Sequence, residues 1–228
     1  MSIIVITGAE QGLGLELARA YAVGGHEVVA GCLKPDTSDM RALSAEHKNV
    51  LVVPLDVTKE GSVAALADRF YNKSADVVIN NAGVHFRKWS MPERVSFADW
   101  ETTLQVNTLG AARVSFALRE SLARSGNGKL VTISSDWGSI SNHPGTAYDY
   151  CSSKAAVNSV MRGIARNWSS DGICVLMIHP GWMRTTMGGA DAPLLPGDSA
   201  ANVKKVIDLA GPADNGRYLD NLGNDMPW

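Results

Sequence analysis

The sequence has little of what membrane, secreted and nucleic-acid-binding proteins require. Its longest apolar runs, such as residues 3–6 and 173–178, fall far short of the ~20 residues that cross a bilayer. The first residues lack the charged start, apolar segment and cleavage site of a signal peptide. Lysine and arginine number 21 against 23 aspartate and glutamate, a net charge of −2, so no basic field attracts a phosphate backbone. We therefore expect a cytoplasmic protein whose partners include neither a membrane nor a nucleic acid.

Cysteine and linker sequence are scarce as well. Cys32, Cys151 and Cys174 are an odd number without C-x-x-C spacing, which argues against a disulfide framework and against a zinc site. We expect three ordinary thiols and no bound metal. With 45% hydrophobic and 19% charged residues, the chain is composed like a globular protein, and its 228 residues favour one domain over residues 1–228.

What the chain does have is a regular alternation of short β-branched runs with longer stretches of helical period, which is typical of βαβ units. The expected strands are residues 3–7, 27–31, 50–54, 77–80, 129–134 and 174–179. The expected helices are residues 13–23, 38–47, 61–72 (with Thr58 as its N-cap), 97–123, 148–169 and 199–210. We predict an α/β fold with a doubly wound, mostly parallel sheet of about seven strands and helices on both faces. The Gly- and Pro-rich stretch near 181–198 predicts a substrate loop or lid.

A glycine-rich turn follows the first expected strand and reads Thr7-Gly8-Ala9-Glu10-Gln11-Gly12-Leu13-Gly14. Glycines let the backbone approach a pyrophosphate, and a helix N-terminus offers free N–H groups and a partial positive charge. The spacing is G-x-x-x-G-x-G rather than the standard G-x-G-x-x-G. The turn therefore predicts an anion site, with a simple tight strand-to-helix turn as the alternative.

The end of the second expected strand bears on the choice between NAD and NADP. In dinucleotide sites an acidic residue there bonds the ribose 2′-hydroxyl, whereas a basic residue accommodates a 2′-phosphate. Lys34 is the first charged residue in this stretch, and Asp36 follows two positions later. We predict that NADP(H) is favoured over NAD(H); the alternative is that Lys34 is a solvated loop lysine.

A tyrosine and a lysine lie on one face of an expected helix. Tyr150 and Lys154 stand at positions i and i+4, where a cation favours the phenolate form and so lowers the pKa of the phenol. Such a pair can exchange a proton with a carbonyl or an alcohol. A surface pair without function is the alternative.

These motifs together resemble the short-chain dehydrogenase/reductase family in its single-domain form. The matching features, in order, are the turn at 7–14, Asn80-Asn81-Ala82-Gly83, Asn107, Ser134-Ser135, Tyr150-x-x-x-Lys154 and Pro180-Gly181. Residues 179–185, 216–220 and 227–228 resemble the C-factor-like or sniffer-like carbonyl reductase subgroup. The resemblance implies an NAD(P)-dependent enzyme that transfers a hydride between a nicotinamide cofactor and a carbonyl or alcohol. A non-catalytic dinucleotide-binding sensor or signalling protein is the alternative function.

The resemblance also implies roles for individual residues. Tyr150 would exchange the proton, and Lys154 would lower its pKa and hold the nicotinamide ribose. Ser135 would bond the substrate oxygen, and Asn107 would hold a water that links Lys154 to solvent. The implied cofactor-binding residues are Gly8, Gln11, Gly12, Leu13, Gly14, Lys34, Asp56, Val57, Asn81, Ala82, Gly83, Tyr150, Lys154, Pro180, Gly181 and Thr185. Asn81 has a second reading, as a cap at the end of a strand.

Two positions depart from the family pattern. The spacing of 15 residues from Ser135 to Tyr150 is longer than usual, so that Ser139 is the alternative catalytic serine and Ser134 is expected to pack on the other face of the strand. Trp137 stands at the usual spacing and cannot replace a hydroxyl, because its indole only donates. Gln11 replaces a frequent arginine, which weakens the prediction of NADP.

The expected substrate-binding residues are Trp137, His143, Trp182 and Met183, whose bulk suggests a small hydrophobic or aromatic carbonyl. Each of them could instead pack in the core or the lid, and His143 is expected to be a loop residue rather than a catalyst. Family relatives form dimers or tetramers through their long helices. We therefore expect a homo-oligomer, with Arg113, Phe116 and Trp168 near the interface.

Overall fold

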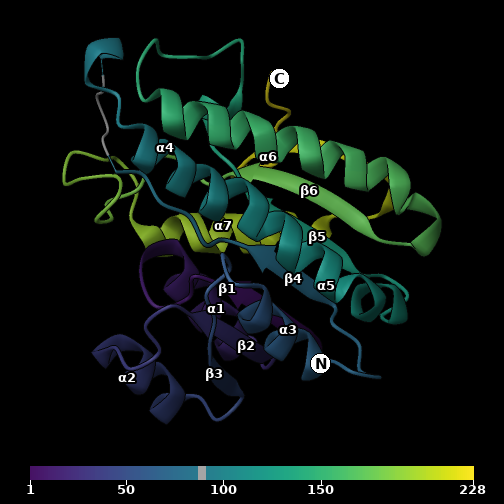
Figure 1. Ribbon diagram of the computed structural model, residues 1–228. Coiled ribbons are helices and arrows are strands. Elements are labelled where there is room, and N and C mark those ends of the chain that lie inside the picture. The colour runs from purple at the N-terminus through teal and green to yellow at the C-terminus, as the bar shows by residue number, and fades with distance from the viewer. Residues whose placement is uncertain (87–90) are drawn as a thin grey trace.

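A single seven-stranded parallel sheet forms the centre of the molecule (Figure 1). The structure is a computed structural model that describes residues 1–86 and 91–228. The strands are β1 (Ile3–Thr7), β2 (Glu27–Cys32), β3 (Val50–Pro54), β4 (Val77–Asn80), β5 (Lys129–Ile133), β6 (Cys174–His179) and β7 (Arg217–Asp220). Their order is β3-β2-β1-β4-β5-β6-β7, and every neighbouring pair is parallel. The predicted doubly wound α/β sheet is confirmed.

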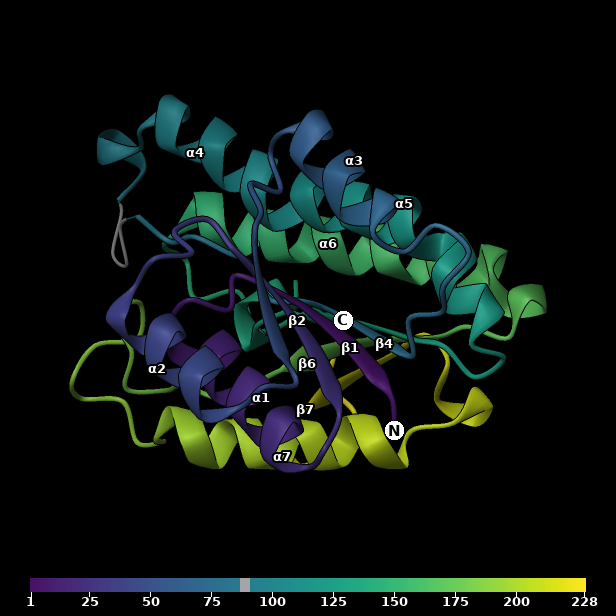
Figure 2. The ribbon, with the colours of Figure 1, turned by 90° about the horizontal axis from the view of Figure 1, so that it is seen from below.

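Helices cover both faces of this sheet, as Figure 2 shows. Helices α1 (Gly12–Val23), α2 (Ser38–Glu46) and α7 (Pro196–Leu209) lie on one side. The other side holds α3 (Glu60–Asp68), α4 (Phe97–Leu104), α5 (Ala111–Arg124) and α6 (Tyr148–Asn167). Neighbouring strand residues serve opposite cores: Ile4 packs with the first layer and Val5 with the second. Since successive side chains of a strand point to opposite faces, apolar runs without alternation follow from a sheet buried on both sides.

The expected long helix 97–123 is interrupted, and this correction concerns the site. A π-helical segment, Gln105–Gly110, separates α4 from α5. It contains Asn107, whose carboxamide accepts a hydrogen bond from Val84 N and donates one to Val84 O, at 2.8 and 3.0 Å. Gly110 lies against Val57, where a Cβ would approach Val57 Cγ2 to 2.6 Å. Single π-turns within helices often occur at functional sites, and this one holds a side chain against the loop after β4.

The expected N-cap of α3 is also wrong. Lys59 occupies the cap position, without a side-chain bond, and the helix runs from Glu60 to Asp68 instead of 61–72. The Thr58 hydroxyl donates to Asp56 Oδ1 at 2.7 Å instead of accepting a bond from a helix amide. A hydrogen bond to a charged carboxylate is stronger than one between two neutral groups. Thr58 therefore orients Asp56. The other predicted ends differ from the structure by a few residues, as helix and strand ends commonly do.

The strand order reverses between β1 and β4, and this is where ligands bind in open parallel sheets. The carboxyl ends of the two strands are tied together there, since Thr7 Oγ1 accepts from the backbone N–H groups of Asn81 and Ala82 at 3.1 and 3.0 Å. Of the helices that the structure describes, none is long and apolar enough to cross a membrane. Within residues 1–86 and 91–228, no cluster of three metal-ligating side chains is found.

Candidate active site

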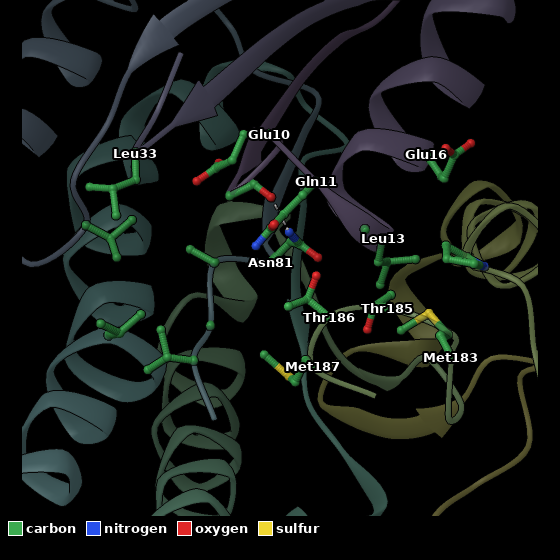
Figure 3. A pocket seen from close by; sticks show the side chains of 18 of the residues that line it. Glu10, Gln11, Leu13, Glu16, Leu33, Asn81, Met183, Thr185, Thr186 and Met187 are labelled. Carbon is green, nitrogen blue, oxygen red and sulfur yellow. Dashed lines mark hydrogen bonds between the residues drawn. The ribbon is translucent and has the colours of Figure 1, made fainter. Parts of the chain in front are cut away.

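Two connected cavities open at the carboxyl edge of the sheet. The first cavity, about 890 Å³, follows the ends of β1, β2 and β4 and the start of α1 (Figure 3). The second cavity, about 290 Å³, lies beside the ends of β5 and β6. Residues from three segments, the start of α1, the loop after β4 and the loop after β6, border both of them: Leu13, Asn81, Gly83, Met183, Thr185 and Met187. A ligand that fills the first cavity therefore reaches the second.

The glycine-rich turn forms one wall of the first cavity. Gly8 and Gly12 have φ angles of +64° and +55°, a region that side chains rarely adopt. A Cβ on Gly8 would lie 2.8 Å from Ala82 Cα, and one on Gly14 would collide with the carbonyl of Gly8. Helix α1 starts at Gly12 without a side-chain cap, which leaves its first amide groups open to an anion. This wall fits the pyrophosphate of a dinucleotide.

Asn81 fixes that turn from below. Its side-chain amide donates to the carbonyls of Thr7 and Gly8, both at 2.9 Å. These two bonds agree with the alternative role of Asn81 as a cap at the end of a strand. The residue also borders both cavities. Ala82 and Gly83 line the first cavity beside it.

The predicted cofactor residues divide between the two cavities. Lining the first are Gly8, Gln11, Gly12, Leu13, Asp56, Val57, Asn81, Ala82, Gly83 and Thr185. Lining the second are Tyr150, Lys154, Pro180 and Gly181, together with the residues that border both. Gly14 lies behind the wall, in the helix-to-loop packing just described. The hydrogen bond from Thr58 lowers the pKa of Asp56, so this carboxylate stays charged on the cavity wall.

Lys34 does not line either cavity. It is exposed, as is Asp36, and Leu33 is the residue of this stretch that lines the first cavity. A strand alternates its side chains, and the loop that follows β2 turns the lysine away toward water. The structure therefore gives no support to the preference for NADP(H) that was predicted from Lys34.

Tyr150 and Ser135 meet in the second cavity. Tyr150 is half-buried in its wall, and desolvation raises the pKa of its phenol, opposed by a hydrogen bond with the Ser135 side chain. Ser135 Oγ also donates to Asp136 Oδ1 at 3.0 Å and accepts from Trp137 N at 3.2 Å. Burial therefore keeps the phenol protonated, and the hydrogen bond with Ser135 orients it.

Lys154 lies deeper than the sequence suggests. Its ammonium donates to the Ile133 carbonyl at 2.7 Å and lies 5.7 Å from the centre of the Tyr150 ring. Burial lowers the pKa of Lys154 to about 8. The expected lowering of the Tyr150 pKa by this lysine is not seen here, because desolvation of the phenol is the larger effect.

Asn107 reaches the same region from the π-helical segment. Besides its two bonds with Val84, its Nδ2 is 3.0 Å from Ser153 Oγ. A Cβ on Gly83 would lie 3.4 Å from Asn107 Oδ1 and 3.7 Å from Lys154 Nζ, so both polar atoms lie close to this glycine. Asn107 thus positions the loop after β4 against α6.

Ser139, the alternative catalytic serine, bonds elsewhere, and Ser134, expected to pack on the other face of the strand, lines the second cavity instead. The Ser139 hydroxyl donates to the carbonyl of Trp228 at 3.3 Å, and Ser139 lines neither cavity. Ser134 Oγ, within the second cavity's wall, donates to Asn158 Oδ1 at 2.7 Å. Ser135 is the serine whose hydroxyl meets Tyr150.

Three of the four expected substrate residues, Trp137, Trp182 and Met183, line the second cavity. His143 does not: it is exposed, and its Nδ1 accepts from Gly145 N at 3.0 Å, which makes it a loop residue. Trp182 is 47% exposed, and its indole N–H donates to the Gly188 carbonyl at 2.8 Å. One bulky side chain therefore borders the open mouth of the cavity.

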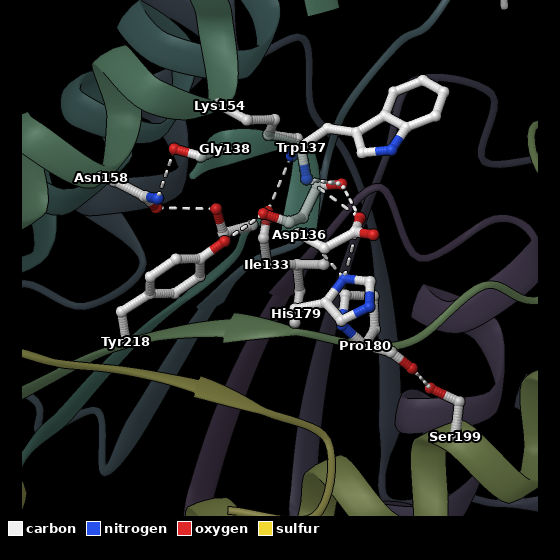
Figure 4. Close-up of polar contacts among 12 residues, drawn as sticks. Ile133, Asp136, Trp137, Gly138, Lys154, Asn158, His179, Pro180, Ser199 and Tyr218 are labelled. Carbon is white, nitrogen blue, oxygen red and sulfur yellow. Dashed lines mark hydrogen bonds and ion pairs between the residues drawn. The ribbon is translucent and has the colours of Figure 1, made fainter. Parts of the chain in front are cut away.

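Several neighbours of this site were not predicted. The His85 ring stacks on Tyr150 with ring centres 4.4 Å apart and meets Trp137 edge-on at 5.9 Å. His179 Nδ1 accepts from Asp136 N at 2.9 Å, as Figure 4 shows, and burial lowers the pKa of this histidine against the charges of Asp136 and Asp220. The Tyr218 hydroxyl donates to the Ser135 carbonyl. Only His85, two residues after the Asn-Asn-Ala-Gly run, had a signal in the sequence.

Residues after β6 close the far side of the site. Gly181 has φ +84°, and a Cβ there would meet Leu194. The Pro180 carbonyl accepts from Ser199 Oγ at 2.6 Å, which joins this turn to α7. Thr185 Oγ1 accepts from Gly188 N at 3.0 Å and its residue borders both cavities.

Known proteins share this architecture. A sequence model described as short chain dehydrogenase matches residues 2–193. The chain is 36% identical over 165 residues to a Myxococcus xanthus protein named C-signal, which covers 72% of this chain and 99% of the relative. It is 32% identical over 239 residues to the 1-hydroxy-2-glutathionyl-2-methyl-3-butene dehydrogenase of Rhodococcus sp. (strain AD45), covering 100% of both. The NADPH-bound carbonyl reductase from chicken fatty liver superimposes with a TM-score of 0.91 at 27% identity, covering 100% of both chains.

Proposed function

This chain belongs to the short-chain dehydrogenase family and is an NAD(P)-dependent oxidoreductase, and we propose that it acts on a small hydrophobic or aromatic carbonyl or the matching alcohol. One observation carries the proposal. The hydroxyls of Tyr150 and Ser135 meet in a small cavity that opens directly into a larger, glycine-walled one. This places proton chemistry beside a site shaped for a dinucleotide.

The residues of the second cavity supply the proton and the orientation. The bound nicotinamide supplies the hydride in reduction or takes it in oxidation. Tyr150 donates its proton to the carbonyl oxygen as negative charge develops there, and its raised pKa suits a donor at neutral pH. The Ser135 hydroxyl, whose one proton is donated to Asp136 Oδ1 in this structure, would turn to donate it to the same oxygen and so fix the direction in which that oxygen faces the phenol.

Lys154 and Asn107 act on the other side of this pair. With a pKa of about 8, Lys154 is largely charged at neutral pH, and its ammonium lies where it can bond the ribose next to the nicotinamide. Asn107 anchors the loop after β4 by accepting a hydrogen bond from Val84 N. Its Oδ1 and the Nζ of Lys154 both lie close to Gly83. A water held there would return protons from solvent to the lysine.

The residues of the first cavity hold the rest of the dinucleotide. The turn at 7–14 and the start of α1 take the pyrophosphate, and Asp56 and Val57 lie beside the adenine. The NADPH bound to the chicken structure supports NADP(H) binding by this chain. Because Lys34 is exposed outside the cavity, the ranking of the two cofactors falls to the side chains that line it.

Aromatic and thioether side chains support the proposed substrate class. Trp137, Trp182 and Met183 offer flat, apolar surface to a ligand beside Tyr150. The segment 181–195 borders both cavities, and its backbone is tied across by Arg184 N, which donates to the Leu194 carbonyl at 2.9 Å. These contacts support the predicted role of this segment as a substrate loop.

The proposal is tested by incubating the purified protein with NADH or NADPH and a panel of aromatic and aliphatic aldehydes and ketones. We expect nicotinamide absorbance to fall fastest with the aromatic or otherwise hydrophobic carbonyls. Cofactor binding without consumption of any carbonyl or alcohol would contradict the proposal and favour the non-catalytic sensor. A sensor needs the first cavity, yet has no use for a buried Tyr150, Ser135 and Lys154.

We also expect a homo-oligomer, although one of its predicted contacts is wrong. Phe116, on α5, is 60% exposed, and Arg113 bonds Gln105 on the same surface at 3.0 Å. Trp168 is 3% exposed and lies beneath Phe116, with ring centres 6.0 Å apart, so it supports the surface rather than forming it. Sedimentation should show a dimer or tetramer; a 24.3 kDa monomer at micromolar concentration would end this expectation.

A further inference from the structure

The backbone of Ser135 lies just beyond the hydrogen-bonded ladder of the sheet. Strand β5 ends at Ile133, and Ser134 N still donates to the Ile178 carbonyl of β6 at 2.8 Å. The Ser135 carbonyl is held by two donors from outside the ladder, Gly138 N at 2.8 Å and the Tyr218 hydroxyl. The position of this serine therefore depends on groups other than its own strand.

One of these donors comes from the far side of β6. Tyr218 lies on β7 in register with Met177 of β6, and its ring points toward the end of β5 (Figure 4). Tyr218 is 2% exposed, lines neither cavity and packs against the Trp228 ring with centres 5.5 Å apart. Burial raises the pKa of its phenol to about 12, so the hydroxyl stays protonated and able to donate near neutral pH. Tyr218 can act on a substrate only through Ser135.

A second buried side chain holds the residues before and after Ser135. Asn158 lies on α6, one turn after Lys154; its Oδ1 accepts from Ser134 Oγ at 2.7 Å, and its Nδ2 donates to the Gly138 carbonyl at 3.3 Å. It is also 2% exposed and lines neither cavity. A Cβ on Gly138 would lie 3.0 Å from both Asn158 Nδ2 and Ser134 Oγ, so the packing is close. Two buried side chains thus fix the segment 134–138 at three residues.

We propose that Tyr218 and Asn158 are positioning residues, which hold the backbone of Ser135 in place while its hydroxyl turns toward the substrate. The inference rests on the proposed function, because it needs Ser135 to bond the substrate oxygen. In this structure the one proton of that hydroxyl goes to Asp136 Oδ1 at 3.0 Å, so the hydroxyl has to turn during the reaction. With the backbone fixed, only the side-chain bonds rotate. A backbone that shifts displaces the hydroxyl, and a displacement of about 1 Å can cost about 10²-fold in rate.

A double-mutant cycle in kcat tests the inference, with an aldehyde that the wild-type protein consumes. Tyr218→Phe keeps the ring that packs on Trp228 and removes the hydroxyl, and it should lower kcat about tenfold. In a Ser135→Ala background no hydroxyl remains to be positioned, so the same substitution should lower kcat by less than about twofold. Affinity for the reduced cofactor, followed by nicotinamide fluorescence, should be unchanged in both backgrounds, which also shows that the variants are folded.

Two further variants sharpen the cycle. Tyr21→Phe is the matched control: it removes the hydroxyl of an equally buried tyrosine, on α1 and outside both cavities, and should leave kcat unchanged in both backgrounds. Asn158→Ala frees Ser134 and Gly138 and should show the same dependence on Ser135 as Tyr218→Phe. If Tyr218→Phe lost cofactor binding through misfolding, the cycle with Asn158→Ala would decide the question.

Three results would overturn the inference. Equal losses of kcat with and without the Ser135 hydroxyl would show a merely structural role. An unchanged kcat in both Tyr218→Phe and Asn158→Ala would show that Ser135 needs no such support. A loss in Tyr21→Phe as large as in Tyr218→Phe would trace the effect to general destabilisation. A wild-type protein that consumes no carbonyl or alcohol would instead overturn the proposed function, and this inference with it.

Discussion

The two cavities differ in how their polar groups are paired. In the first, α1 begins without a side-chain cap, which leaves its first amide groups open to a ligand. In the second, Lys154 is bonded to the Ile133 carbonyl, Ser135 to Asp136, and the Ser135 carbonyl to Tyr218. An unpaired wall is completed by its ligand, whereas a paired network holds reacting groups in place beforehand. The difference assigns binding to the first cavity and chemistry to the second.

Ionisation follows the same division. Desolvation moves the pKa values of Tyr150 and Lys154 well away from their ordinary values in the second cavity. In the first, Asp56 keeps its charge through the bond from Thr58. Strongly shifted groups in a cleft are typical of catalytic residues, and charged ones of a polar binding surface. Variants that separate binding from turnover therefore test this comparison.

Tyr150→Phe should have the largest effect and should act on the second cavity alone. The substitution keeps the ring that stacks on His85 and removes the proton, so turnover should fall by about 10²–10⁴-fold. Affinity for the reduced cofactor, measured by nicotinamide fluorescence, should stay within about twofold of wild type because no wall of the first cavity changes. Turnover near the wild-type rate would show that another group is the acid.

Ser135→Ala should have the next largest effect and decides between the serines. Loss of one donor to the substrate oxygen should lower turnover by roughly 10²-fold. Ser139→Ala is the matched control, since its hydroxyl bonds the Trp228 carbonyl outside both cavities, and its activity should stay close to wild type. A reversed pattern, with Ser139→Ala the damaged variant, would mean that the chain rearranges around Tyr150 on binding substrate.

Lys154 should make stability depend on pH in a way that its replacement by methionine removes. Burial lowers its pKa from 10.5 to about 8, so below pH 8 the folded state holds a desolvated charge. From about pH 8 to pH 10 the unfolded chain binds more protons than the folded one, and stability rises with pH. Relative to Lys154→Met, the wild-type protein should gain on the order of 2 kcal/mol over this window. Denaturant unfolding of both proteins at pH 7 and pH 10 measures this gain in the free energy of unfolding. An equal change with pH in the two proteins would contradict the burial of the Lys154 ammonium.

Trp182→Ala should have the smallest effect, confined to substrate affinity. The indole borders the second cavity and is 47% exposed, so its loss should raise KM for an aromatic aldehyde several-fold, by about 1 kcal/mol, with kcat changed less. A short aliphatic aldehyde is the control substrate and should show little change in KM. An equal rise for both substrates would mean that the tryptophan shapes the loop rather than contacting the ring.

Sequence reasoning located what local patterns encode. The strands are apolar runs buried on both faces, and the turn at 7–14 and the pair Tyr150 and Lys154 follow from glycine geometry and helical spacing. The interruption of the helix at 105–110 includes weak helix formers such as Asn107 and Gly110, but propensity alone does not specify a π-helical segment. It arises where Asn107 bonds Val84 and where Gly110 meets Val57, contacts between segments far apart in the chain. Such packing cannot be read from one segment.

The errors have the same origin. Lys34 and His143 have suitable chemistry at suitable positions in the chain, yet both are exposed, because the direction of a loop side chain depends on its neighbours. Trp168 is buried under Phe116 rather than presented at the surface.

The measurement that tests the central claim most directly follows the hydride itself. The purified protein is given reduced cofactor labelled with deuterium at the transferring position of the nicotinamide, together with an aromatic aldehyde that it consumes. Because the two cavities share a border and the hydride passes directly from the nicotinamide carbon to the carbonyl carbon, without exchange with water, mass spectrometry should find one deuterium in the alcohol product. Product alcohol without the label, or bound cofactor with no alcohol formed, would contradict the account.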